Sequence, residues 1–212
     1  MLKKVGLAAA ALLAVPGVAQ AAEGLNGAYY AGGYGGNISG APTATFTATN
    51  ICYPNCGTDI SDTESLSTFL NVSGGNATGL STDVSGLSGH ALTLAGYIHI
   101  LTGGLQTFGL SSDDGSYLQI DGQTVVNNAG VHSLTYAQTA IDLAAGWHSI
   151  YIYQEENAGV TGLSAWINYR PLTSNILSTI AVPEASTWAM MIVGVGFAGT
   201  ALRRRKAAAH AA

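Results

Sequence analysis

Positive charge is the scarcest feature of this sequence of 212 residues, of which only 9% are charged and seven are lysine or arginine. Six of those seven stand near the two ends, as Lys3, Lys4 and the run 203–206. Between residues 22 and 182, eleven acidic residues are opposed by Arg170 alone, which gives a net charge of −10. Such a segment repels polyanions and attracts divalent cations, so we expect no nucleic-acid partner.

Cysteine is nearly as scarce, because the only two, Cys52 and Cys56, flank a Tyr-Pro-Asn segment. A zinc site needs further ligands nearby, and a redox-active pair usually has a C-x-x-C spacing. In an exported protein this pair favours a local disulfide across the Pro-Asn turn. The loop that it closes is short, so its expected role is to set local shape rather than to add much global stability.

Catalytic motifs are absent as well: the sequence has no G-x-S-x-G, H-E-x-x-H or P-loop pattern. Glycosidases place two carboxylates on either side of the scissile bond, whereas the acidic pairs Asp113-Asp114 and Glu155-Glu156 are adjacent in sequence. The histidines of the central segment stand singly and favour packing or surface roles: His90, His99, His132 and His148. We therefore predict that the protein is not an enzyme.

The N-terminus has the three parts of a secretory signal peptide. Two lysines precede an apolar run, residues 5–18, and a small-x-small site, Ala19-Gln20-Ala21, follows. We predict cleavage after Ala21, which makes residues 1–21 the signal peptide. An N-terminal membrane anchor is the poorer interpretation, because the apolar run is short and contains Pro16 and Gly17.

The C-terminus carries an uncharged stretch, residues 185–202, followed at once by the basic run 203–206. Its length is near the lower limit for a membrane-spanning helix, and its glycines are tolerated in such helices. By the positive-inside rule, the basic run stays cytoplasmic and the residues before Pro183 lie outside. An ordinary membrane anchor explains this hydropathy pattern equally well.

The order of motifs in this tail resembles the PEP-CTERM sorting signal of exopolysaccharide-producing Gram-negative bacteria. Pro183-Glu184, a Trp188-Ala-Met-Met-Ile core, a glycine-rich span and Arg203-Arg204-Arg205 follow one another as in that family, although Ala185 replaces its frequent second proline. The resemblance implies passage through the inner membrane and cutting near Pro183 by an exosortase. The protein is then released or attached to the cell surface. On this interpretation residues 177–182 are a linker, 183–206 the sorting signal and 207–212 a tail.

The segment between the two ends has the pattern of an all-β protein. Short apolar runs bounded by turn residues predict an antiparallel sandwich or barrel. Residues 59–70 suit a short helix capped by Ser61 or Asp62, or an irregular connection, and residues 71–89 suit a long surface loop. The expected strands lie at 25–30, 43–51, 95–101, 105–110, 117–120, 124–126, 139–143, 148–154 and 163–169.

Asp113 and Asp114 stand between two of these strands, and Asp121-Gly122 after the second is a strong signal for a two-residue hairpin turn. The acidic pair is therefore expected on a tight loop at one end of a sheet. Adjacent carboxylates in such a place suit a hard cation with oxygen ligands, for which Ca²⁺ is the usual choice. The alternative is that both are turn-forming residues in solvent.

The stretch Ser111-Ser-Asp-Asp-Gly-Ser-Tyr-Leu-Gln-Ile-Asp-Gly122 resembles the signature of the PA14 domain, the protective-antigen-type β-sandwich. Residues 24–30, 141–148 and 163–166 resemble its opening and closing strands. The resemblance implies a sandwich over residues 22–176 of a kind often used in carbohydrate recognition. In its lectin members the Asp-Asp pair is joined by a cis peptide and holds Ca²⁺, which coordinates sugar hydroxyls; Asp113 and Asp114 match that pair.

Those lectins add an asparagine and backbone carbonyls from a later loop, and Glu156 and Asn157 stand in about that place without a motif that fixes their roles. The resulting hypothesis is an exported surface or matrix protein that binds glycan or exopolysaccharide through calcium. Two alternatives stay open. The protein is a structural matrix component whose Asp-Asp-Gly only shapes a loop, or an accessory domain to a separate glycan hydrolase.

Overall fold

The computed structural model of the chain describes residues 22–180, 191 and 193–198. The expected signal peptide with its cleavage site Ala21, and the sorting residues Pro183, Glu184, Trp188 and 203–205, lie outside the described residues. Within the described residues, no helix is long and apolar enough to cross a membrane. Most of the span expected at 185–202 lies outside them.

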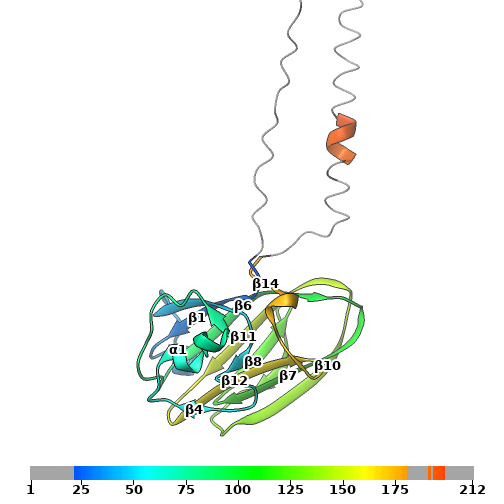
Figure 1. Ribbon diagram of the computed structural model, residues 1–212. Coiled ribbons are helices and arrows are strands. Elements are labelled where there is room, and N and C mark those ends of the chain that lie inside the picture. The colour runs from blue at the N-terminus through cyan, green and yellow to red at the C-terminus, as the bar shows by residue number, and fades with distance from the viewer. Residues whose placement is uncertain (1–21, 181–190, 192, 199–212) are drawn as a thin grey trace, which may run out of the picture.

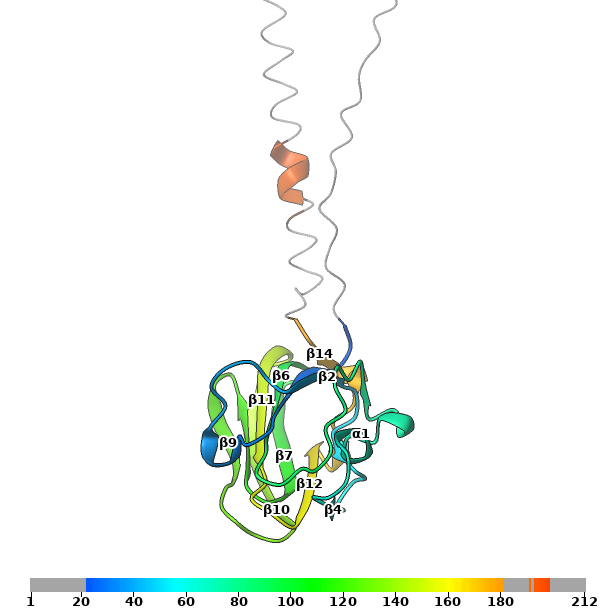
Figure 2. The ribbon, with the colours of Figure 1, turned by 90° about the vertical axis from the view of Figure 1, so that its left-hand side faces the viewer.

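Two antiparallel sheets pack face to face (Figures 1 and 2). The first has the order β5-β2-β1-β6-β11-β8-β9, with β14 also paired to β6. Its strands are β5 (Ala77–Thr78), β2 (Ala44–Ala48), β1 (Leu25–Tyr30), β6 (Ala91–Ile100), β11 (Gly146–Glu155), β8 (Ser116–Ile120), β9 (Gln123–Asn128) and β14 (Leu177–Ser178).

The second sheet has the order β10-β7-β12-β13, and β3 and β4 also pair with β12. Four single-turn helices lie in the connections. The strands are β10 (Thr135–Leu143), β7 (Gly104–Asp113), β12 (Val160–Ile167), β13 (Arg170–Pro171), β3 (Cys52–Tyr53) and β4 (Ile60–Ser61); the helices are α1 (Leu66–Phe69), η1 (Tyr34–Gly36), η2 (Val72–Gly74) and η3 (Ser174–Ile176).

Alternating apolar residues build the core between the sheets. On β11, Ile150 and Ile152 are buried, and Ile152 lies opposite Leu118 of β8. In the other sheet, Phe108 and Leu110 of β7 are both fully buried. Since burying one such side chain is worth about 1.5–3 kcal/mol, these stripes fix which face of each strand points inward. The predicted all-β sandwich is confirmed.

Two expectations about the segment before β6 are wrong in part. Residues 71–89 are not simply a surface loop, because they contain η2 and β5 and bury Leu87 completely. The short helix begins later than expected: the Ser65 side chain accepts a hydrogen bond from the Thr68 backbone N–H and caps α1. Ser61 belongs instead to β4, where it pairs with Val160.

The turns follow the local sequence closely. Asp121 and Gly122 join β8 to β9 with φ angles of 50° and 77°, the left-handed conformation that a two-residue hairpin loop requires. Cys52 and Cys56 form a disulfide with their Cα atoms 4.4 Å apart. The two ends of the sandwich domain meet, because the Thr179 backbone N–H donates to the Ala22 carbonyl at 3.0 Å. Pairing of β14 with β6 brings the first two residues of the expected linker into the sheet.

Candidate metal centre

Asp113 is the last residue of β7, and Asp114 and Gly115 connect it to β8. The peptide bond between Asp113 and Asp114 is cis. Gly115 has no room for a side chain, because a Cβ there would lie 2.9 Å from the Gly130 nitrogen and 3.0 Å from its carbonyl oxygen. The glycine therefore lets the β9–β10 connection approach the acidic pair closely.

Both aspartates are buried: Asp113 is 5% exposed and Asp114 is 4% exposed. This burial contradicts the interpretation that they are turn residues in solvent. A carboxylate so removed from water needs hydrogen-bond donors or a cation, since burying an uncompensated charge is costly.

Backbone donors fix the orientation of Asp114. Its Oδ1 accepts from the His132 N–H at 2.9 Å, and its Oδ2 accepts from the Asn157 N–H at 3.0 Å. The main chain of Asp113 is held as well, because its carbonyl accepts from Gln154 Nε2 at 3.0 Å. The loops after β9 and β11 therefore meet at the acidic pair.

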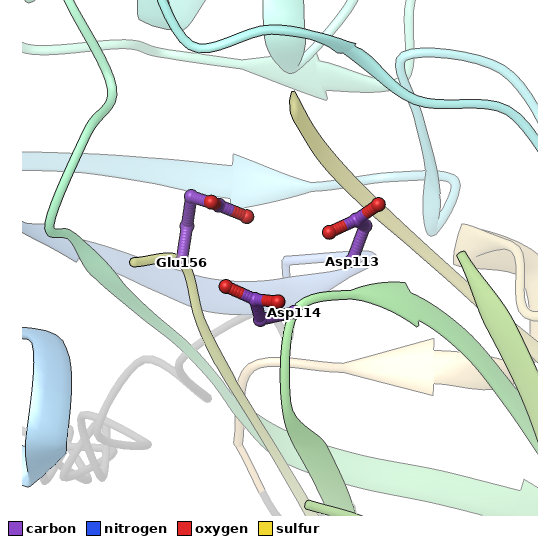
Figure 3. Close-up of side chains that lie close together, drawn as sticks. All are labelled: Asp113, Asp114 and Glu156. Carbon is purple, nitrogen blue, oxygen red and sulfur yellow. The ribbon is translucent and has the colours of Figure 1, made fainter. Parts of the chain in front are cut away.

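Glu156 directly follows β11 and completes the cluster (Figure 3). It is fully buried, and neither of its carboxylate oxygens has a hydrogen-bond partner among the described residues. One carboxylate oxygen from each of Asp113, Asp114 and Glu156 lies within 4.8 Å of the others. We call these three residues the acid trio.

Crowding of the trio opposes its ionisation. Burial, followed by the charges of Asp114 and Asp113, raises the pKa of Glu156 to about 8. Burial and then the Asp114 charge also raise the pKa of Asp113. The only Lys or Arg of the central segment, Arg170, is the first residue of strand β13 and forms no ion pair with the trio. A bound cation would relieve this repulsion.

The donor set fits calcium. Ca²⁺ binds oxygen ligands at about 2.3–2.6 Å, so the ligands of one ion are at most about 5 Å apart, and the three oxygens of the trio meet this limit. The imidazole of His132 does not compete for the position, because its ring nitrogens face the carbonyls of Asn128 and Ser133. A site made only of carboxylates favours a hard cation over zinc.

Two loops close over the trio. Gly159 and Asp62 exchange hydrogen bonds of 2.9 Å, in which each backbone N–H donates to an oxygen of the other residue. The Asn157 carbonyl accepts from Ser88 Oγ at 3.1 Å and from the Gly89 N–H at 2.9 Å. These bonds hold residues 156–159 against the connections before β6, and they explain why Glu156 has no contact with solvent.

The structure thus brings Glu156 to the aspartates. Asn157 contributes only its backbone N–H, which donates to Asp114, and the residue is exposed. Two buried neighbours were not predicted from the sequence. His90 places Nε2 3.0 Å from Gln154 Oε1, and Gln154 in turn supports Asp113. Nothing in the local sequence signals this link, because His90 and Gln154 are 64 residues apart.

Comparison with known families agrees with this geometry: residues 77–177 match the PA14 domain family. The chain contains a PA14 domain. Residues 181–206 match the PEP-CTERM protein-sorting motif, so both predicted resemblances are confirmed. A PA14 domain followed by this motif indicates an exported surface protein. Among curated proteins, none matches the chain by sequence.

Solved structures with the same fold include isolated PA14 domains. The PA14 domain of the MpAFP antifreeze protein is 23% identical, with a TM-score of 0.63, and the match covers 76% of this chain and 93% of that one. The PA14 sugar-binding domain from an RTX adhesin is 25% identical, with a TM-score of 0.61 and coverage of 74% and 98%. Both matched chains are single PA14 domains, so in those proteins this fold stands alone.

A third match is the A domain of epithelial adhesin 6 from Candida glabrata, solved with Galβ1-3GlcNAc. It is 13% identical, with a TM-score of 0.56, and the match covers 80% of this chain and 92% of that one. At this identity the likeness concerns the fold. These PA14 neighbours are binding or adhesin domains rather than enzymes.

Proposed function

We propose that this protein binds carbohydrate, such as exopolysaccharide, at the cell surface or in the extracellular matrix, through a calcium site formed by the acid trio. The observation that carries the proposal is Glu156: a fully buried carboxylate with two unpartnered oxygens, aimed at two further buried carboxylates. The likeness of this chain to the sugar-binding domain of the RTX adhesin supports carbohydrate as the ligand.

Each residue of the site has a distinct task in this proposal. Asp113, Asp114 and Glu156 supply oxygen ligands, and the backbone N–H groups of His132 and Asn157 hold Asp114 in place. Calcium, when bound, offers its remaining coordination positions to sugar hydroxyls or water. Because the trio repels itself without a cation, the site gains affinity for Ca²⁺ from relief of that repulsion.

A second function is favoured by the burial of the trio. Since its members are between 0% and 5% exposed, a bound ion would touch little solvent unless residues 156–159 move. The ion would then brace the loops of a structural surface component and present nothing to a glycan. Both functions require the cation, and they differ in whether calcium changes sugar binding.

Calcium titration and a glycan array together test the proposal. We expect stoichiometric binding of Ca²⁺ to residues 22–182, and loss of that binding in the variant Asp113→Asn/Asp114→Asn. The matched control is Asp142→Asn, which removes an exposed charge from β10. Glycan binding that needs calcium and fails in the double variant supports the lectin function. Calcium binding without any glycan signal supports the structural one, and absence of calcium binding refutes both.

The two ends of the precursor give a separate proposal about processing. We infer that a signal peptidase cuts after Ala21 and that an exosortase recognises Pro183, Glu184, Trp188 and the arginines 203–205 and cuts near Pro183. The match of residues 181–206 to the sorting motif supports this. Mass spectrometry of the exported protein tests it, with Glu184→Gln and Trp188→Ala as variants. Retention of residues 203–206 in the exported wild-type protein would contradict it.

A further inference from the structure

The end of the sandwich opposite the acid trio contains a groove of about 690 Å³. It opens between the two sheets, where the β6–β7 turn meets the β12–β13 turn and the segment around η3. Gln106 of β7 lines it, seven residues before Asp113 on the same strand. At about 3.3 Å per residue, the groove and the trio are roughly 23 Å apart. They are therefore separate sites.

The charge of the groove is opposite to that of the domain. Of the eleven acidic residues between 22 and 182, none lines the groove, whereas the one cation, Arg170, does. Arg170 is exposed and, among the described residues, has no ion-pair partner. An unpaired guanidinium in such a place offers bidentate donors that match the geometry of a carboxylate.

The turn that carries Arg170 holds a tyrosine in an unusual conformation. Asn168 and Tyr169 link β12 to β13 with φ angles of 50° and 62°, and Tyr169 is 75% exposed. Glycine or asparagine is the usual choice at such positions, since other side chains are strained there. Packing does not explain the tyrosine, because its side chain lies mostly in solvent. Its ring does not line the groove, but Tyr169 stands next to Arg170, where a ligand longer than the groove would reach it.

The groove is firmly built beneath that turn. Asn168 Oδ1 accepts from the Thr107 N–H at 2.9 Å, and Asn168 Nδ2 donates to Gln106 Oε1 at 2.7 Å. The Asn168 N–H also donates to the Thr107 carbonyl at 2.7 Å. The groove-forming turn is therefore tied to β7 by three hydrogen bonds. Such preformed walls lower the entropy cost of binding a ligand.

The remaining lining combines two chemistries. Ile100, Ile167 and Ile176 supply apolar wall residues, and the polar wall residues Thr173 and Asn175 hydrogen-bond to each other through their side chains. An apolar wall with a few polar groups suits a small organic ligand, and the volume is in the usual range for one. A pyranose ring presents an apolar face and hydroxyl edges, so it matches both walls.

We propose that this groove binds a carbohydrate that carries a carboxylate, namely a uronic acid unit of an acidic polysaccharide. Arg170 pairs with the carboxylate, Thr173 and Asn175 bind hydroxyls, and Tyr169 contacts the part of the polysaccharide that leaves the groove. The choice of carbohydrate as ligand class rests on the proposed function. Binding in the groove requires no metal, so it can be tested independently of the acid trio.

The test is a calorimetric titration of residues 22–182 with tetragalacturonic acid, in the presence of EDTA. The uncharged methyl ester of the same tetramer is the control ligand. We expect the acid to bind at least tenfold more tightly than the ester, and Arg170→Gln to lose at least tenfold in affinity for the acid. Arg170→Lys should keep part of the affinity. Asn37→Asp adds the same change in net charge on an exposed loop and should have no effect.

Three results would overturn the proposal: equal binding by the wild type and Arg170→Gln, equal binding of acid and ester, or binding seen only after calcium is added. Arg170-dependent binding to phosphatidylglycerol vesicles without binding of the acidic tetramer would assign the groove to a lipid headgroup instead. Asp113→Asn/Asp114→Asn should bind the acidic tetramer in EDTA as the wild type does. Failure of the calcium site is thereby distinguished from failure of the groove.

Discussion

The two ends of strand β7 show opposite ways of placing charge in one small sandwich. At its C-terminal end Asp113 joins two other buried carboxylates, enclosed by loops that are hydrogen-bonded to one another. Near its N-terminal end the groove has no acid in its lining and exposes Arg170 on a short turn. The acidic end is closed and crowded, and the groove end is open.

This difference indicates which end of the domain makes folding depend on pH and on cations. Buried charges of one sign change their pKa values and so couple folding to pH and to cations. A single exposed charge does neither to a comparable extent, because water screens it. We therefore expect the acidic end to control the stability of the domain, and the groove end to affect binding with little effect on folding.

The largest expected effect concerns Glu156 in the metal-free domain. Its pKa is about 8 in the folded chain and about 4.3 when unfolded. Glu156 therefore does not oppose folding below about pH 4.3. As pH rises from there to about 8, its ionisation lowers the free energy of unfolding by on the order of 4 kcal/mol. Glu156→Gln cannot ionise, so its stability in EDTA should fall much less over this range. Urea unfolding at pH 5 and pH 8 measures both slopes.

Calcium should reverse which of the two proteins, the wild type or Glu156→Gln, is the more stable at pH 8. At pH 8 the ion stabilises the wild type through three carboxylates, whereas Glu156→Gln keeps only two. The variant should therefore bind calcium at least tenfold more weakly than the wild type. Asp142→Asn is the control and should follow the wild type in both conditions. Equal pH slopes for the wild type and Glu156→Gln would show that Glu156 is not held unpaired in the folded chain.

A second prediction disturbs the acidic end without changing its charge. In Gly115→Ala the new methyl group would lie 2.9 Å and 3.0 Å from backbone atoms of Gly130, which cannot rotate away. We expect a loss of about 1–3 kcal/mol in the free energy of unfolding, together with weaker calcium binding, because Asp114 is adjacent. Gly32→Ala is a contrast, since a Cβ there contacts nothing, although its φ of 72° also disfavours a side chain. If both variants lose equally, the contact with Gly130 is not the cause.

The acidic end was largely predictable because its signals are local. Asp113-Asp114-Gly115 lies between the apolar runs of β7 and β8, and alternation predicted both strands. Glu156 was named only because it stands in about the place of a later loop that the PA14 resemblance implies. Its place in the trio depends on pairing of β8 with β11, in which Ser116 lies opposite Gln154, and a single sequence does not reveal that register.

The groove end was not predicted, for a physical reason. The expected strand 163–169 ran through the turn at Asn168 and Tyr169, and this was wrong, because β12 ends at Ile167. A hairpin loop without glycine gives no clear turn signal. Arg170 was recognised only as a lone cation, since its groove is assembled from two segments, 99–106 and 167–176, that are distant in sequence.

A third prediction tests whether Tyr169 is kept for binding rather than for folding. Glycine adopts a φ of 62° without strain, so Tyr169→Gly should raise the free energy of unfolding by about 1 kcal/mol. The same variant should weaken binding of the acidic tetramer, because the exposed ring is lost. Tyr34→Gly is the control for removal of an exposed tyrosine. A loss of stability in Tyr169→Gly would show that the ring supports the fold.

The smallest effect belongs to the ion pair at the groove end between His148 Nδ1 of β11 and Asp121 Oδ2 of the β8–β9 turn, which are 2.6 Å apart. Burial opposes protonation of His148, but its bonds to Asp121 and the Ala144 carbonyl, with the Asp121 charge, raise its pKa. The contribution is therefore complete below about pH 6.5 and is lost as pH rises through the raised value. Since Asp121 is 52% exposed, Asp121→Asn should cost at most about 1 kcal/mol at pH 5.5 and less at pH 9. A cost in urea unfolding that is larger at pH 9 would mean that the turn, rather than the ion pair, depends on Asp121.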